Sequence, residues 1–174
     1  MSTGNYATVN GHTMYYEQTG AGYPVVLLHG GLHTINLSFE KQISVFAQHR
    51  HVIAIEQMGH GHSADCQGSF SYTQMAEDTA DLLHQLTITN ADFVGWSDGG
   101  ILTLLLARHY PTLVRRAVIS GANTRAEGLS VSALTYFRET HPEQIAKDLS
   151  RLREAYALAS PDGSDHWPVI VELS

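Results

Sequence analysis

The sequence lacks several features that would assign it to a specialised class of protein. Its single cysteine, Cys66, cannot form a disulfide within the chain, which favours a reducing compartment. The longest apolar run, Ile101–Ala107, is far shorter than the ~18 residues that span a bilayer. Residues Met1–Tyr6 contain neither the basic nor the apolar part of a secretion signal. We therefore expect a cytoplasmic protein without a membrane-spanning segment.

Positive charge is also scarce. Ten Lys and Arg residues stand against 17 Asp and Glu residues, which gives a formal net charge of −7. This balance argues against nucleic acid or an anionic membrane surface as a partner. With 43% hydrophobic residues over 174 positions, the chain has enough apolar side chains to bury the core of one compact domain.

The order of the predicted elements indicates the fold class. An Asn-Gly turn at Asn10 separates two alternating segments, Tyr6–Asn10 and His12–Gln18, and predicts a β-hairpin. Apolar runs and helical periodicity then alternate along the chain. The predicted strands are Tyr23–Leu28, His51–Glu56, Asp92–Trp96 and Val114–Ser120, with helices at Ser38–Gln48, after the capping-box residue Ser71, and at Gly99–Tyr110. This pattern predicts an α/β protein with a mostly parallel sheet of about six strands and helices on both faces.

Beyond Gly121 the sequence shows helical patterns and no further convincing strand. Pro142 suits the first turn of a helix, and an apolar stripe follows it through Ile145, Leu149, Leu152 and Tyr156. Asp165–Leu173 reads as one more short helix. We therefore divide the chain into a core, residues 1–124, and a helical segment, residues 125–174.

The segment Gly95–Gly99 reads Gly-Trp-Ser-Asp-Gly and fits the Gly-x-Ser-x-Gly pattern of a nucleophilic serine. It lies between a predicted strand and a very apolar helix, which is the structural context that this pattern requires. Glycines on either side of Ser97 leave room for a sharp turn, and the helix that begins there offers unpaired N–H groups. The alternative interpretation is a structural serine in a turn.

A second glycine-rich loop, His29–Leu32, follows the predicted strand Tyr23–Leu28. Loops at the carboxyl ends of parallel strands face the ligand crevice. We expect the N–H groups of Gly31 and Asp98 to form an oxyanion hole, with Leu32 as the neighbouring candidate donor. His29 is interpreted as a residue that braces this loop rather than as a base, and we place His29, Leu32 and Trp96 at the substrate pocket.

These motifs, together with Glu56–Ser63 (Glu-Gln-Met-Gly-His-Gly-His-Ser) between them, resemble the successive signatures of the α/β-hydrolase family. The Trp-Ser-Asp-Gly-Gly form is similar to the biphenyl-hydrolase-like and valacyclovirase-like esterases. The resemblance covers about residues 6–123. The sequence departs from the family at Met58, where arginine is common, and this affects an ion pair that would brace the loop. The resemblance also implies that the helices after Gly128 form a cap over the site.

The resemblance implies a Ser–acid–His order, with the acid and the histidine after two further strands that would lie beyond Ser174. In some members the acid follows the strand Val114–Ser120, but the residue here is Asn123. Without the two strands, Val114–Ser120 would be an exposed sheet edge with unpaired backbone groups. We therefore expect two copies of the chain to associate there as a homodimer or higher oligomer.

Several histidines are candidates for the missing base. His166 on the helical segment and His33 beside the oxyanion loop are the two that could reach Ser97. His60 and His62 are interpreted as solvated loop residues that shape the pocket. His84 and His109 are interpreted as surface residues of helices. None of them has an acid in an obvious orienting position in the sequence, as a triad requires.

The leading functional hypothesis is a serine esterase that acts on small or medium esters through an acyl-enzyme on Ser97, with no cofactor or metal and weakened by the missing acid and histidine. The first alternative is a non-catalytic binding module that keeps the pocket. The second is a metal-dependent hydrolase, since His60-x-His62-x-x-Asp65 is one residue away from a His-x-His-x-Asp pattern, with His49 and His51 nearby.

Overall fold

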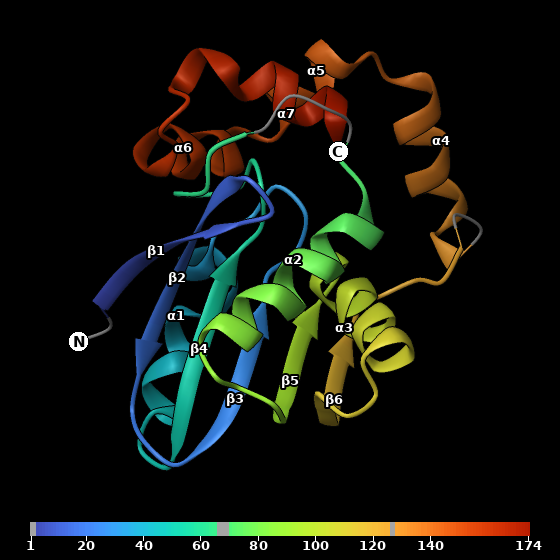
Figure 1. The fold of residues 1–174 in the computed structure, drawn as a ribbon. Coiled ribbons are helices and arrows are strands. Elements are labelled where there is room, and N and C mark those ends of the chain that lie inside the picture. The colour runs from blue at the N-terminus through green and yellow to red at the C-terminus, as the bar shows by residue number, and fades with distance from the viewer. Residues whose placement is uncertain (1–2, 66–69, 126–127) are drawn as a thin grey trace.

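The computed structural model describes residues 3–65, 70–125 and 128–174, so Cys66 lies outside the described residues. Its six strands form one sheet in the order β1-β2-β4-β3-β5-β6. Strands β1, β2 and β4 pair antiparallel, whereas β4, β3, β5 and β6 run parallel (Figure 1). The strand bounds are Thr3–Val9, His12–Thr19, Tyr23–Leu28, Arg50–Glu56, Ala91–Trp96 and Val114–Ser120 for β1 to β6. The predicted mostly parallel α/β sheet is confirmed.

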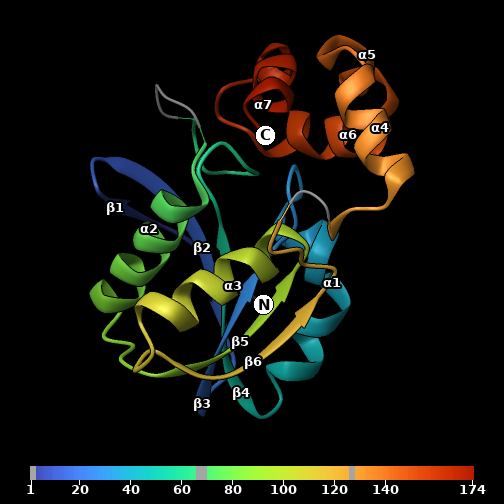
Figure 2. The same cartoon turned by 90° about the vertical axis from the view of Figure 1, so that its right-hand side faces the viewer.

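Helices cover both faces of this sheet. Helix α1 (Ile35–Phe46) packs on one face, and α2 (Tyr72–Gln85) and α3 (Asp98–His109) pack on the other (Figures 1 and 2). The larger core lies under α2 and α3 and includes Ile53 and Phe93, which are almost fully buried. The strands β3 and β4 read as continuous apolar runs because both of their faces are covered.

Capping residues fix where the helices begin. The hydroxyl of Ser71 accepts a hydrogen bond from the N–H of Gln74, so the Ser-x-x-Gln pattern marks the start of α2 as predicted. Helix α1 begins three residues earlier than the predicted Ser38. The hydroxyl of Thr34 accepts from the N–H of Leu37, and the N–H of Ile35 donates to the Glu56 carboxylate at 3.0 Å. Both contacts satisfy N–H groups of the first helical turn.

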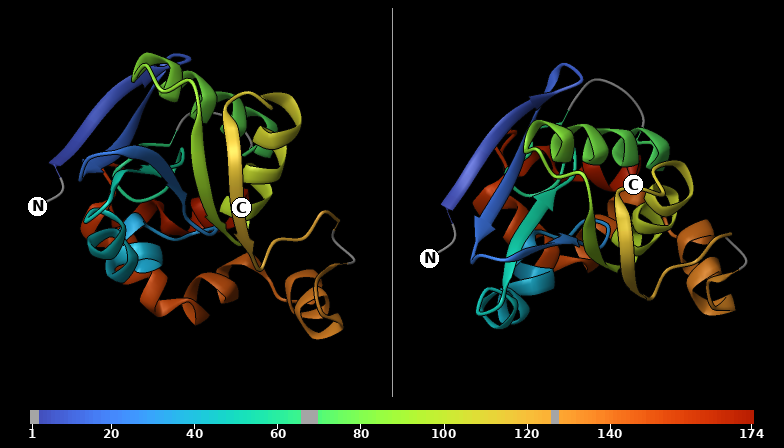
Figure 3. Two further views of the ribbon diagram at one scale, coloured as in Figure 1. Left: turned by 90° about the horizontal axis from the view of Figure 1, so that it is seen from below. Right: turned by 60° about the horizontal axis from the view of Figure 1, so that its bottom comes forward.

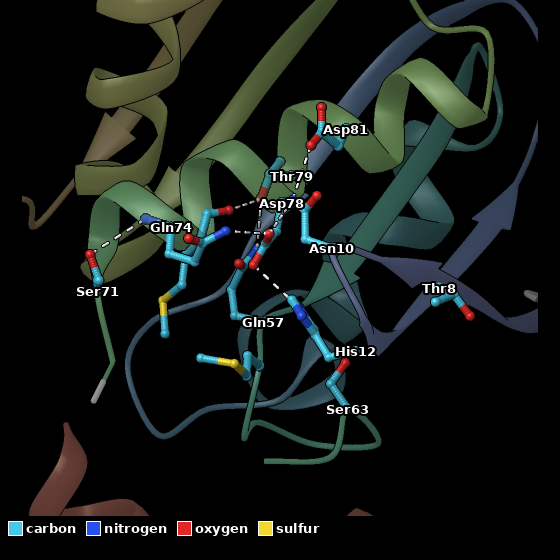
Figure 4. Close-up of polar contacts among 12 residues, drawn as sticks. Thr8, Asn10, His12, Gln57, Ser63, Ser71, Gln74, Asp78, Thr79 and Asp81 are labelled. Carbon is cyan, nitrogen blue, oxygen red and sulfur yellow. Dashed lines mark hydrogen bonds and ion pairs between the residues drawn. The ribbon is translucent and has the colours of Figure 1, made fainter. Parts of the chain in front are cut away.

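A buried carboxylate joins α2 to the N-terminal hairpin. Asp78, which is 1% exposed, accepts hydrogen bonds from the side chains of Asn10 at 2.7 Å and Gln74 at 2.9 Å (Figure 4). The Nε2 atom of His12 lies 3.2 Å from the second carboxylate oxygen. A buried carboxylate requires polar partners, and two of them, Asn10 and His12, come from the β1–β2 hairpin and tie the helix to it. Met58 is buried and makes no charged contact of the kind an arginine would provide.

The residues after β6 form four α-helices above the carboxyl ends of the parallel strands (Figures 1 and 2). The prediction of one continuous helix through Leu149 is wrong, since ψ of +44° at this residue separates two short helices. A further helix precedes them, and the predicted C-terminal helix is present. Their bounds are Val131–Glu139, Pro142–Asp148, Ser150–Ala159 and Trp167–Leu173 for α4 to α7.

The α4–α7 segment has its own apolar cluster. Trp167 and Ile170 are almost fully buried within it, and the Trp167 indole N–H donates to the carbonyl oxygen of Ala146 at 2.9 Å. Leu32 and Phe70 of the core pack against the same cluster, which fixes the segment over the end of the sheet. No helix among the described residues is long and apolar enough to cross a membrane.

Strand β6 is the outer strand of the sheet (Figure 3). Within the described residues it pairs only with β5, which leaves the backbone groups of its other edge unpaired. The apolar side chains of Val118 and Ile119 in this strand are 63% and 37% exposed. The expected exposed edge is therefore present.

The close approach of α3 to β3 gives a stability prediction. A Cβ atom at Gly99 would overlap the carbonyl oxygen of Leu28, which is backbone and cannot turn aside. Replacing glycine by alanine within a helix ordinarily stabilises it by up to about 1 kcal/mol. We expect Gly99→Ala instead to lower the free energy of unfolding by about 2 kcal/mol or more, measured by urea denaturation.

Ala107→Gly, at an exposed position of the same helix, is the matched control. It should cost only about 1 kcal/mol through the intrinsic preference of helices for alanine. Unchanged or increased stability of Gly99→Ala would contradict the close approach.

Candidate active site

Ser97 occupies a strained turn between β5 and α3. Its φ of +53° and ψ of −117° lie in a region that non-glycine residues rarely adopt. The Ser97 N–H donates to the carbonyl oxygen of Ser120 at 2.8 Å, and the N–H of Gly100 donates to the Ser97 carbonyl at 2.8 Å. A Cβ atom at Gly95 would overlap the Gly99 carbonyl. The two glycines of the motif are therefore required by the turn, as predicted.

The His29–Leu32 loop packs directly against this turn. A Cβ atom at Gly30 would lie 3.3 Å from the Ser97 Cβ and would overlap the Trp96 ring, while one at Gly31 would overlap the Asp98 carboxylate. Asp98 is the first residue of α3, so its N–H has no acceptor within the helix. The two predicted oxyanion donors thus belong to segments that meet beside Ser97.

His29 braces this loop. Its Nδ1 lies 2.7 Å from the Gly30 carbonyl oxygen, and its Nε2 accepts the N–H of Gln57 at 3.0 Å. Both ring nitrogens are therefore engaged, with the proton on Nδ1. Burial, together with the neighbouring His60, lowers the pKa of His29 to about 3. The ring is neutral at physiological pH and is not available as a base, in agreement with its interpretation from the sequence.

A cavity of about 50 Å³ opens beside the loop and the start of α3. Four of its lining residues carry titratable side chains, namely His29, His60, Tyr72 and Asp98. Burial raises the pKa of Asp98, although the Tyr72 hydroxyl and His60 act in the opposite direction. Burial and the Asp98 carboxylate raise the pKa of Tyr72 to about 12. The cavity is lined by His29, Gly30, Gly31, Gln57, His60, Phe70, Tyr72, Met75, Asp98, Leu102, Leu173 and Ser174.

Two predicted pocket residues lie outside this lining. Leu32, with φ of +58°, packs against the apolar cluster of α4–α7. Trp96 is 38% exposed, and its ring contacts His33 at a centroid distance of 4.5 Å. Gln57 and Tyr72 line the cavity but were not singled out from the sequence. The capping box places Tyr72 at the first turn of α2, whereas nothing local to Gln57 indicates its position.

The histidines differ from their predicted settings in two respects. His60 is not a solvated loop residue, since it is only 5% exposed and its Nδ1 lies 2.8 Å from the Met58 carbonyl oxygen. Acidic partners are also present: His166 Nε2 lies 2.9 Å from Asp65, and His62 Nδ1 lies 2.8 Å from Glu56. These pairs join residues far apart in the sequence or across a tight loop, so spacing alone did not reveal them.

His33 remains beside the turn, with Nδ1 3.4 Å from the Ser38 hydroxyl. Burial, followed by the effects of His60 and Arg151, lowers the pKa of His33 to about 4. His84 and His109 are exposed on their helices, as expected. No group of three or more His, Cys, Asp or Glu side chains in residues 3–65, 70–125 and 128–174 is arranged to hold a metal ion. The metal-dependent alternative therefore gains no support.

Comparison with known proteins agrees with this geometry. A family model described as the alpha/beta hydrolase fold matches residues 23–162. The chain belongs to the α/β-hydrolase family.

Several named hydrolases are similar to this chain in sequence. The chain is 36% identical to serine hydrolase BPHL of Homo sapiens over 120 residues, which cover 66% of this chain and 41% of that protein. It is 38% identical to the putative carbamate hydrolase RutD of Yersinia enterocolitica over 109 residues, or 60% of this chain and 39% of that protein. The chain thus spans about two fifths of the length of these curated relatives.

Solved structures of the family share the architecture. Est816, described as an N-acyl homoserine lactone degrading enzyme, superimposes with a TM-score of 0.75 at 25% identity, over 94% of this chain and 74% of that one. DBJA gives a TM-score of 0.81 at 19% identity, over 98% and 68% of the two chains, and this likeness concerns the fold alone. The chain is accordingly an α/β hydrolase by sequence and by fold.

Glu56 organises the loop of this α/β hydrolase that follows β4. Its carboxylate is 1% exposed and accepts hydrogen bonds from the N–H of Ile35, from the N–H of His62 at 2.6 Å and from the His62 ring. A Cβ atom at Gly61 would overlap this carboxylate. Burial acts to raise the pKa of Glu56, but the hydrogen bonds from His62 and Ile35 outweigh it and the pKa is lowered. The bond to Glu56 raises the pKa of His62, against the smaller effect of burial.

The two opposite shifts predict a window of pH in which this pair stabilises the fold. The contribution of Glu56 is present above the ordinary carboxyl pKa of 4.5 and is lost as the pH falls through its lowered pKa. The contribution of His62 is complete below 6.5 and is lost as the pH rises through its raised pKa. Urea denaturation should therefore show the largest stability difference between wild type and His62→Gln at pH 4.5–6.5.

His84→Gln, at an exposed position on α2, is the control and should show no such window. A difference between wild type and His62→Gln that is independent of pH would contradict the ion pair.

Proposed function

We propose that this α/β hydrolase cleaves carboxylic esters through an acyl-enzyme on Ser97. The observation that carries the proposal is the strained Ser97 turn, held at φ of +53° against a glycine-rich loop and at the start of a helix. In the reaction, Ser97 Oγ attacks the ester carbonyl carbon, and the N–H groups of Gly31 and Asp98 stabilise the oxyanion. The alcohol leaves, and water then releases the acid from Ser97.

The expected turnover rate depends on whether a group near Ser97 can accept the proton of its hydroxyl. His29 is engaged at both nitrogens and is not assigned as the proton acceptor. His166, paired with Asp65, and His33, beside Ser38, stay candidates, but among the described residues neither forms a hydrogen bond with the Ser97 hydroxyl. A serine site without its base retains the contribution of the oxyanion hole and of binding, on the order of 10³–10⁴ over water in a protease studied in this way. We expect turnover well below that of a complete esterase.

The substrate is expected to be a small or medium ester. The cavity lining combines the apolar side chains of Phe70, Met75 and Leu102 with polar side chains that could orient a substrate. We assign residues 125–174 as a cap, supported by the packing of Leu32 and Phe70 against its apolar cluster. We also propose a cytoplasmic location.

Replacement of the nucleophile tests the proposal. Ser97→Ala should abolish turnover of a p-nitrophenyl ester of a short acid, because no other group is placed at the turn to form the acyl-enzyme. Ser44→Ala, at an exposed position of α1, is the control and should keep the wild-type rate. Equal turnover by Ser97→Ala and wild type would exclude the mechanism.

The alternative is a non-catalytic binding module, which is favoured by the engagement of His29 and His166 with other partners. Labelling of Ser97 by a fluorophosphonate probe distinguishes the two functions. An activated serine reacts with the probe and the modified peptide is identified by mass spectrometry. A chain that binds its ligand but leaves Ser97 unlabelled is a binding module.

We further propose that two copies of the chain associate through β6. The unpaired edge and the exposed side chain of Val118 support this, since an exposed apolar strand is a template for pairing with another chain. Light scattering at micromolar concentration should give the mass of a dimer or higher oligomer. Val118→Lys should shift the mass toward the monomer, because a charge on the edge opposes pairing. A monomeric wild type would contradict the proposal.

A further inference from the structure

Leu32 has a backbone conformation that leucine rarely adopts. The His33 N–H donates to the Gly30 carbonyl oxygen at 3.1 Å, so residues Gly30–His33 form a β-turn. The φ of Leu32 is +58°, whereas the φ of Gly31 is not positive. Type II is the common turn with a positive φ at its third residue alone, and glycine or asparagine ordinarily occupies that position. Leu32 is therefore a strained residue in the loop that carries the proposed oxyanion donors.

Contacts on two sides hold this turn in place. The Leu32 side chain is half-buried and packs against the apolar cluster of the α4–α7 segment. On the other side, a Cβ atom at Gly31 would overlap the Asp98 carboxylate at the start of α3. A strained backbone conformation persists only where its surroundings enforce it. Because the leucine itself disfavours the turn, the packing of its side chain is the contact that can offset the strain.

The conformation of Leu32 sets the direction of the peptide group that joins it to Gly31. A type I turn has negative φ at both central residues and is the relaxed alternative for leucine. The central peptide group points in opposite directions in turns of types I and II, because the two dihedral angles on either side of it differ. Relaxation to type I would therefore exchange the directions of the Gly31 carbonyl oxygen and the Leu32 N–H. The loop packed against the Ser97 turn would then present a different arrangement of donors and acceptors.

We propose that Leu32 is a positioning residue, which couples the docking of the α4–α7 segment to the conformation of the Gly30–His33 turn. When the segment is docked, the packing of Leu32 against its cluster stabilises the type II turn. When this packing is lost, the turn relaxes to type I and the proposed oxyanion donors are no longer placed for the reaction. The proposal rests on the proposed function in assigning this loop to the oxyanion hole, and it adds that the helical segment controls the site.

Two substitutions of Leu32 separate the packing from the strain. Leu32→Ala removes the packing and keeps the strain, whereas Leu32→Gly removes both, because glycine adopts positive φ readily. In the isotope-labelled full chain, the NOE between the Gly31 α protons and the amide proton of residue 32 is strong in a type II turn and weak in a type I turn. We expect a strong NOE in the wild type and in Leu32→Gly, and a weak one in Leu32→Ala.

Ester turnover should follow the same order. A left-handed conformation costs a non-glycine residue about tenfold in population, so Leu32→Ala should lower turnover about tenfold. Leu32→Gly should stay within about twofold of the wild type, since glycine adopts positive and negative φ about equally. A role in packing alone predicts no advantage of glycine over alanine. Leu152, which packs against the same cluster from within α6, is the control, and Leu152→Gly should be no better than Leu152→Ala.

A change within the α4–α7 segment gives an independent measurement. Ile170→Ala opens a space in the apolar cluster and should weaken the NOE when residue 32 is leucine. It should leave the NOE unchanged in Leu32→Gly, where the turn no longer needs the packing. This pair of chains decides the question if Leu32→Ala fails to fold.

A weak NOE in the wild type, an equally strong NOE in Leu32→Ala and the wild type, or slower turnover by Leu32→Gly than by Leu32→Ala would each overturn the coupling. The NOE does not depend on turnover. The expected NOE series in a chain whose turnover survives Ser97→Ala therefore counts against the proposed function alone. Turnover that is lost in Ser97→Ala, with an NOE that does not respond to Leu32→Ala, counts against the coupling alone.

Discussion

The close contact between the backbone of α3 and the end of β3 is the constraint on which the site depends. Gly99 lies so near the Leu28 carbonyl that no side chain fits between them, and Gly95 lies equally near Gly99. This contact brings the first N–H groups of α3 to the loop that follows β3. It also forces Ser97 into a conformation that a serine would not adopt by itself. The surrounding sheet, with β5 between β3 and β6, supplies the packing that sustains this strain.

A chain of buried hydrogen bonds connects the His29–Leu32 loop to helix α2. Thr79 of α2 accepts from Gln57, the Gln57 N–H donates to His29, and His29 donates to the Gly30 carbonyl. Every member is almost fully buried, so each bond is made in a low-dielectric setting where an unpaired group would be costly. The loop is consequently positioned by α2 as well as by β3. A substitution at Asp78 or Thr79 that changes the packing of α2 is therefore expected to shift the position of the His29–Leu32 loop.

Local patterns in the sequence predicted those parts of the structure that local physics determines. The Ser71 cap, the Gly95–Gly99 turn and the buried strand Tyr23–Leu28 each follow from neighbouring residues. The break at Leu149 and the burial of His60 do not, because both depend on segments packed from elsewhere in the chain. The pairs His166–Asp65 and His62–Glu56 were missed for the same reason. Sequence patterns predicted the turn at Ser97 but not the hydrogen bonds that engage the histidines.

The positioning of Ser97, the proposed nucleophile, and the transfer of its proton are separate requirements in this fold. The turn, the helix start and the loop of the proposed oxyanion hole are all built by residues between β3 and β6. The strain at Ser97 is a backbone property and does not depend on any histidine. The His29 ring is engaged at both nitrogens, whereas the His60 ring holds the Met58 carbonyl through Nδ1. A serine held in this way can direct its hydroxyl at a bound carbonyl, and its reactivity then depends on whichever group accepts the proton.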